Sequence, residues 1–137
     1  MRKFLIMSPV VVLALIALGA GPANSHHIKA TFQPANGSGV SGFVNLTGLP
    51  QGGTVITVHA TGLTPGGHYL SIYYENHTCE LVSDSVPNDV IAHYDGGADG
   101  TANAHAKIDD DLDEVNSISV RLDDTALTLQ ACADVHP

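Results

Sequence analysis

The chain has 137 residues, which suits one domain better than two. It contains 14 acidic side chains against 5 basic ones, a formal charge of −9. Such a surface repels phosphate backbones and anionic headgroups, so the composition excludes general nucleic-acid binding and disfavours attachment to an anionic membrane. Apolar residues make up 44% of the chain, and this share, together with 14 glycines, indicates a compact, turn-rich domain rather than a disordered one.

Residues 1–25 have the pattern of an export signal. Arg2 and Lys3 give a positive start, residues 4–19 are mostly apolar, and residues 23–25 are small enough for cleavage. The alternative is an uncleaved membrane anchor, which the shortness of the apolar run disfavours. Cleavage would leave residues 26–137, with 14 acidic and 3 basic groups and a formal charge of −11. We therefore expect a secreted or periplasmic protein with no membrane contact after cleavage.

The chain has two cysteines, Cys79 and Cys132. An even number of cysteines in an exported chain indicates one disulfide, and two free thiols are the alternative. The two positions are 53 residues apart. Closing a loop of that length could stabilise the fold by roughly 4 kcal/mol through the entropy of the unfolded chain.

The rest of the sequence predicts short strands joined by turns, without an amphipathic helix. The period of two is clearest in residues 54–61, where Ile56, Val58 and Ala60 share one face and His59 lies on the other. We expect strands over residues 28–33, 40–46, 54–61, 68–74, 90–94, 101–108, 115–122 and 126–135, with residues 95–100 as a hairpin connection. Eight short strands at regular spacing predict one all-β domain, an antiparallel barrel or sandwich.

Three stretches carry motifs in a recognisable order. Residues 37–46 read GSGVSGFVNL, residues 55–68 read VITVHATGLTPGGH, and residues 131–135 read ACADV. They resemble the first hairpin, the following strand with its Gly-Leu-Thr turn and histidine, and the cysteine-containing last strand of the Cu/Zn superoxide dismutase family. The resemblance covers about residues 30–135. It implies a Greek-key β-barrel or sandwich, and it supports the pairing of Cys79 with Cys132, because equivalent cysteines are joined in the family.

The resemblance also implies a copper site, for which this chain lacks the ligands. The family's His-x-His pair falls at Ser71 and Tyr73. These side chains lie on the strand face opposite Leu70 and Ile72, and we expect them to point outward beside the core. A serine hydroxyl is a poor copper ligand, and a tyrosine with a pKa of about 10 normally keeps its proton.

The other family positions have also lost their ligands. Asp89 falls near the zinc carboxylate, but a lone aspartate cannot hold zinc. Arg121 or Leu122 stands at the remaining copper histidine, and Leu129 at the active-site arginine. His68 matches a histidine that makes a structural hydrogen bond beneath the copper in the family. Dismutation needs a metal that cycles by one electron, so the resemblance implies the scaffold without the activity.

Four of the eight histidines suggest a metal site of another kind. After cleavage His26 would offer its α-amine and imidazole to Cu(II), with His27 assisting, and the alternative is a frayed terminus. His59 and His105 are expected to face away from the core, where pairing across strands could form an exterior site. The alternative is two solvated imidazoles. Copper is therefore the one cofactor that these histidines suggest.

Two further polar groups carry hypotheses. His93 and Asp95 fall on one strand face, which favours a hydrogen bond at a strand end over a ligand pair. Residues 109–114 read DDDLDE and lack the Gly and Glu that an EF-hand loop needs. This acidic run is then a looser calcium site or a solvated loop.

The sequence as a whole predicts an exported superoxide dismutase-like β domain without the family's copper ligands. Its expected role is a non-catalytic extracytoplasmic binding or structural module. One alternative is a redox enzyme with copper held by non-family histidines, and another is a copper-binding or carrier protein that uses His26 and His27. No partner is indicated, and a homodimer stays open.

Overall fold

A computed structural model describes residues 26–137, so the predicted export signal lies outside the described residues. The strands are β1 (His27–Thr31), β2 (Gln33–Pro34), β3 (Ser41–Gly48), β4 (Thr54–Thr61), β5 (His68–Tyr74), β6 (Val90–Asp95), β7 (Ala102–Ile108), β8 (Ser117–Leu122) and β9 (Leu129–Asp134). A short helical turn, α1 (Ser85–Asn88), follows β5, and a 3₁₀ turn, η1 (Leu112–Glu114), follows β7. The prediction of an all-β protein is confirmed.

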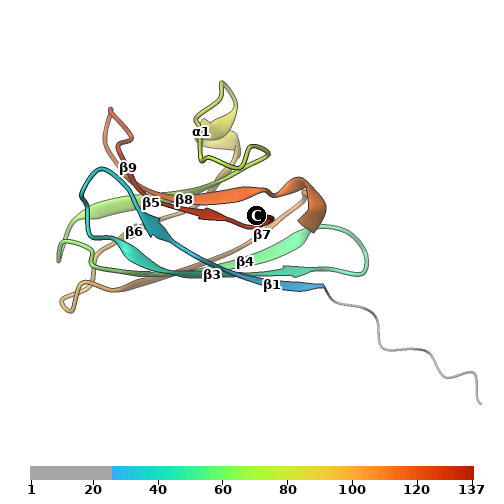
Figure 1. Ribbon diagram of the computed structural model, residues 1–137, viewed down its shortest axis with the longest axis horizontal. Coiled ribbons are helices and arrows are strands. Elements are labelled where there is room, and N and C mark those ends of the chain that lie inside the picture. Colours follow the sequence, from blue (N-terminus) through green and yellow to red (C-terminus); the bar gives the residue numbers. More distant parts are fainter. Residues whose placement is uncertain (1–25) are drawn as a thin grey trace, which may run out of the picture.

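The strands form two antiparallel sheets that stack as layers (Figure 1). Sheet A has the order β1-β3-β4-β7, and sheet B has the order β2-β9-β8-β5-β6. Each sheet ends in an edge strand that no ladder joins to the other sheet. The fold is therefore an open sandwich, and the closed barrel among the predicted alternatives is wrong.

The first predicted strand is divided between the two sheets. β1 pairs with β3 as far as Thr31, and then Gln33 and Pro34 of β2 pair with β9. Phe32 lies at the crossing and is only 1% exposed. Burial of this ring between the layers stabilises the crossing and yields nine strands where eight were predicted.

The connection at residues 95–100 also crosses between the sheets. The turn itself is closed by hydrogen bonds from the Gly97 amide to the Thr101 carbonyl, at 2.8 Å, and from the Gly100 amide to the Gly97 carbonyl, at 2.9 Å. However, β6 pairs with β5 and β7 pairs with β4. The predicted hairpin is therefore a turn between layers and not a pair of bonded neighbours.

Apolar side chains fill the space between the sheets. The predicted inner face of β4 is confirmed, since Ile56, Val58 and Ala60 are all at most 1% exposed. A second, smaller apolar cluster lies on the outer side of sheet B. It contains Leu70, Ile72, Tyr74 and Cys79.

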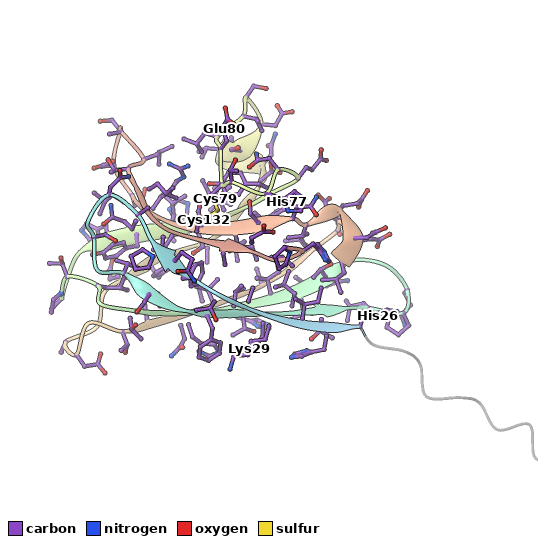
Figure 2. All side chains as sticks on the ribbon, viewed as in Figure 1. His26, Lys29, His77, Cys79, Glu80 and Cys132 are labelled. Carbon is purple, nitrogen blue, oxygen red and sulfur yellow. A yellow bond between two sulfur atoms is a disulfide. The ribbon has the colours of Figure 1, made fainter. Side chains whose placement is uncertain are left out.

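The predicted disulfide between Cys79 and Cys132 is present, with its Cα atoms 5.9 Å apart. It ties the segment after β5 to β9, beneath the loop that carries α1 (Figure 2). A disulfide is typical of an exported protein. Across residues 26–137, we find no helix with the length and apolar character needed to cross a bilayer.

Candidate functional site

β5 carries Ser71 and Tyr73, the two positions at which the resemblance to the superoxide dismutase family led us to expect copper ligands. Ser71 is paired with Val120 of β8, and Tyr73 is paired with Ile118. Both partners belong to the core between the sheets, so Ser71 and Tyr73 share that face. Ser71 is 0% exposed and Tyr73 is 8% exposed. The expectation that these two side chains point outward is therefore wrong.

The reason is that β5 is buried on both faces. The alternation along β5 correctly predicts that Ser71 lies on the opposite face of the strand from Leu70 and Ile72. The outer face is covered as well, because the segment after β5 is held against sheet B by the disulfide. A strand covered on both sides has no polar face to indicate which side points to the other sheet.

The hydroxyl of Ser71 is bonded to another side chain inside the sandwich. Its Oγ lies 2.7 Å from the hydroxyl of Tyr94 on β6. Burial raises the pKa of Tyr94 to about 12, and its ring stacks on Tyr69 with centroids 6.4 Å apart. A neutral phenol paired with an alcohol is a poor donor set for copper. The residues at this position do not fit the family's metal.

Tyr73 lies at a cavity of about 380 Å³ that we call the Tyr73 cavity. The cavity is lined by four carboxylates, from Glu75, Asp84, Asp89 and Asp110. Burial, followed by the negative charges of Asp110 and Asp89, raises the pKa of Tyr73 to about 12. Burial also raises the pKa of Asp89, and the neighbouring carboxylates add to this effect while the Tyr73 hydroxyl opposes it. The phenol stays protonated beside this acidic group.

Asp89 is therefore not the lone carboxylate that the sequence suggested. Asp110, from the acidic run after β7, acts on the same Tyr73 hydroxyl. Sequence reasoning missed this neighbour because the two aspartates belong to segments that meet only when the sandwich forms. Within residues 26–137, no three His, Cys, Asp or Glu side chains are placed to hold a common metal ion.

Arg121, one of the two residues that the resemblance suggested for a further copper position, stabilises the structure on the outer side of sheet B. It is 7% exposed. Its Nε donates to the Tyr74 hydroxyl at 2.9 Å, and its terminal nitrogens donate to the carbonyls of Leu127 and Cys79 at 2.6 Å each. This buried cation therefore joins the turn before β9 to the disulfide, and it is not available to guide a substrate.

Leu122 is the alternative to Arg121 at that position, and Leu129 is the residue suggested for the family's active-site arginine. Leu122 packs against the core between the sheets, and Leu129 packs against the second cluster. Neither side chain has a lone pair for a metal or a charge for an anion. Both positions therefore contribute packing and no chemistry.

His68 makes a hydrogen bond at the surface and not beneath a metal. Its side chain is 72% exposed, and its Nδ1 lies 2.6 Å from an oxygen of Asp95. The expected bond between His93 and Asp95 is wrong, because His93 instead lies 2.7 Å from an oxygen of Asp123. His68 and Asp95 are directly opposite on β5 and β6. Opposite residues on paired strands are closer than residues two apart on one strand.

Three of the four histidines suggested as metal ligands lie on the outer face of sheet A, on β1, β4 and β7. As expected, His59 and His105 face away from the core. His59 is hydrogen-bonded through Nδ1 to the side-chain oxygen of Asn103, and His105 Nδ1 lies 3.2 Å from the hydroxyl of Thr57. Each imidazole thus bonds to the residue directly opposite it, so the two do not converge on one site.

His26 and His27 line a cavity of about 580 Å³, the terminal cavity, at the end of the sandwich where Figure 2 labels His26. His136 lines the same cavity, together with Asp113 of η1 and Asp111, which precedes η1. Sequence reasoning did not single out His136, because almost the whole described chain separates it from His26. Only the fold brings these three imidazoles to one cavity.

The acidic run at residues 109–114 is divided among different tasks. Asp110 lines the Tyr73 cavity, whereas Asp113 lines the terminal cavity. Asp111 accepts a hydrogen bond of 2.8 Å from the Gly53 amide, and its own amide donates to Glu114. The run is therefore not arranged as one calcium loop.

No protein-family model matches this chain, and no curated protein matches it. The Tyr73 cavity and the terminal cavity both have room for a ligand.

Proposed function

We propose that this chain is an exported β-sandwich protein of the Cu/Zn superoxide dismutase-like type that works without copper chemistry, as a non-catalytic extracytoplasmic binding or structural module. One observation carries the proposal. Ser71 and Tyr73 are buried between the sheets, where Ser71 is hydrogen-bonded to Tyr94. One-electron chemistry on superoxide needs a redox metal within reach of the substrate. The Ser71 hydroxyl is packed into the core, and the Tyr73 hydroxyl keeps its proton beside carboxylates, so the two do not form a copper ligand pair.

The order in which the strands are connected supports the proposed superoxide dismutase-like fold. β4 and β7 are neighbours in sheet A, and β5 and β8 are neighbours in sheet B, although neither pair is consecutive in the chain. The chain therefore passes between the layers from β4 to β5, from β6 to β7 and from β7 to β8. Crossings of this kind are typical of Greek-key sandwiches.

Two features support the proposed location. Residues 1–25 have the charge and hydropathy pattern of an export signal. The bond between Cys79 and Cys132 is of the kind that oxidising compartments preserve. Both features favour a secreted or periplasmic protein.

The proposal is tested by a superoxide-quenching assay on the purified protein after incubation with Cu(II) and Zn(II) and dialysis. We expect no rate above that of the same amount of free copper. A higher rate that His59→Gln or His105→Gln abolishes would support the redox enzyme instead. The matched control is His77→Gln. His77 is an exposed histidine that is not on sheet A, and its Nδ1 lies 2.8 Å from Asp134 of β9 in sheet B.

The terminal cavity favours a second candidate function, that of a copper-binding or carrier protein. His26, His27 and His136 line this cavity with two aspartates. Imidazole nitrogens are good ligands for Cu(II). The side chains are not already placed around a common point in the described chain, so binding copper would require them to reorient.

The carrier hypothesis predicts stoichiometric Cu(II) on a protein that begins at His26, measured by metal analysis after dialysis. The copper should be lost when residues are added before His26, and also in His136→Gln. It should remain in His93→Gln, which removes an imidazole that is bonded to Asp123 and does not line the terminal cavity. Copper that survives both changes would eliminate this candidate.

A further inference from the structure

The exposed large apolar side chains of residues 26–137 all belong to one loop. They are Leu81, Val82 and Val86, which are 38%, 57% and 42% exposed. We call these three residues the α1 patch, because α1 lies in the same loop between β5 and β6. Figure 1 shows this loop standing out from sheet B. Exposed apolar side chains that gather in one place among polar ones are typical of an interaction site.

The backbone of this loop is held in place before any partner binds. The disulfide between Cys79 and Cys132 ties the start of the loop to β9. Within the loop, the Ser85 amide donates to the Val82 carbonyl at 3.1 Å, and the Val82 amide donates to the Ser85 hydroxyl at 3.0 Å. A surface that is already ordered loses little conformational entropy on binding. The α1 patch is therefore preorganised for contact.

The Tyr73 cavity lies directly beside the α1 patch. Val82 belongs to both, because it also lines this cavity of about 380 Å³. Ligand pockets in proteins have volumes of about 300–1,000 Å³, so the Tyr73 cavity is near the lower end of that range. It has room for one inserted side chain or a small molecule.

The Tyr73 cavity has many hydrogen-bond acceptors and few donors. Its four carboxylates face the hydroxyl of Tyr73, which can donate only one proton. The hydroxyl of Tyr74 is bonded to Ser119 at 2.7 Å, and the side-chain amide of Asn76 donates to the Glu80 carbonyl at 2.9 Å. These two neighbours are therefore engaged elsewhere, and the carboxylates are short of donors.

No cation of the described chain compensates these carboxylates. Within residues 26–137, the ion pairs join histidines to aspartates, and none of them includes a carboxylate of the Tyr73 cavity. Arg121 is buried and donates to Tyr74 and to two carbonyls, and Lys29 and Lys107 belong to sheet A. The cavity therefore favours a positively charged group that brings its own hydrogen-bond donors.

The chemistry of the two adjoining surfaces selects among cations. A metal ion is disfavoured, because no three His, Cys, Asp or Glu side chains of residues 26–137 are placed around a common point. A small polyamine would satisfy the charge but leave the α1 patch uncovered. An anionic membrane would repel the carboxylates. A guanidinium presents five donors in a planar fork, pairs with carboxylates through two bonds and loses its weak hydration more easily than an ammonium.

We propose that the α1 patch and the Tyr73 cavity together bind a protein segment in which an arginine is flanked by apolar residues. This inference rests on the proposed function, because it names the kind of partner that the binding module takes. The guanidinium enters the Tyr73 cavity and bonds to its carboxylates. The flanking apolar side chains pack against Leu81, Val82 and Val86.

The test is a titration of the purified, isotope-labelled protein with the peptide acetyl-Leu-Arg-Leu-amide, followed by NMR. We expect saturable shifts of backbone amides in residues 73–89 and at Asp110. The same peptide with citrulline in place of arginine keeps the shape without the charge, and it should bind about tenfold more weakly or worse. Acetyl-Gly-Arg-Gly-amide keeps the charge without the apolar groups, and it should bind about three- to tenfold more weakly.

Two matched pairs of variants locate the binding site. Asp84→Asn removes a charge from the Tyr73 cavity at a side chain that makes no capping bond to α1, and Asp113→Asn makes the same change at the terminal cavity. We expect about two- to fivefold weaker binding for the first and no change for the second. Val82→Ser should weaken binding about three- to tenfold, whereas Val55→Ser, on the outer face of sheet A, should not.

Absence of saturable binding, or equal binding of the arginine and citrulline peptides, would overturn the inference. Equal weakening within either pair of variants would do the same, as would spermidine that binds as tightly as acetyl-Leu-Arg-Leu-amide. Self-association that Val82→Ser abolishes would assign the α1 patch to a second copy of the chain instead. The proposed function fails separately, through superoxide quenching above free copper in the metal-loaded protein. Absence of peptide binding without any such quenching removes this inference alone.

Discussion

The inward orientation of Ser71 predicts that a histidine placed there damages the fold and does not create a copper site. In Ser71→His, an imidazole must fit where the side chain is 0% exposed and faces the core. Overpacking of a filled core costs about 1–3 kcal/mol. Burying the polar ring where the Tyr94 hydroxyl is the hydrogen-bond partner of the present side chain costs about 1–3 kcal/mol more. We expect a loss of about 2–6 kcal/mol, out of a total stability of about 5–15 kcal/mol.

The measurement is the free energy of unfolding in urea. The matched control is Ser41→His, because Ser41 lies on the outer face of sheet A, where an imidazole has room. We expect the control to change stability by less than about 0.5 kcal/mol. Electron paramagnetic resonance should show no specific Cu(II) site in Ser71→His. A variant as stable as the control, or one that acquires such a site, would refute the orientation of β5.

Two further predictions concern stability. Replacing both cysteines, in Cys79→Ser/Cys132→Ser, should lower the free energy of unfolding by about 4 kcal/mol, and a reductant should produce the same loss in the unmodified protein. An unfolding curve insensitive to reductant would contradict this. Because burial raises the folded-state pKa of Asp89, its stabilising effect is present below the ordinary value of 3.8 and is lost as pH rises through the raised value. Asp89→Asn should therefore raise the free energy of unfolding by up to about 1 kcal/mol at pH 7 and leave it unchanged near pH 3. The measurement is urea unfolding of both proteins at the two pH values. A difference that does not depend on pH would be evidence against the raised pKa of Asp89.

The elements with alternating polarity were predicted best. β4 spans residues 54–61, as expected, because Ile56 and Val58 face the core while Thr57 and His59 face solvent. β5 also has its predicted bounds, yet its inner and outer faces could not be assigned. Both of its faces are buried, so the pattern of polarity that distinguishes the faces of β4 is missing there.

The candidate site was predicted less well, because its neighbours come from distant segments. Asp89 and Asp110 act on one tyrosine, and His136 joins His26 at one cavity. Nothing in the local sequence links these positions. Their proximity follows from the stacking of two sheets, which brings the ends of different strands together.

The amino-acid sequence by itself determined the all-β class, most strand positions and the disulfide. These properties depend on local backbone preference, on residue identity and on the number of cysteines. Only the tertiary structure decided that Ser71 and Tyr73 point inward, that His93 bonds to Asp123, and that four carboxylates meet at the Tyr73 cavity. Strand register and the packing of the two layers set these outcomes, because a residue's neighbours belong to strands that can be distant from it in the sequence.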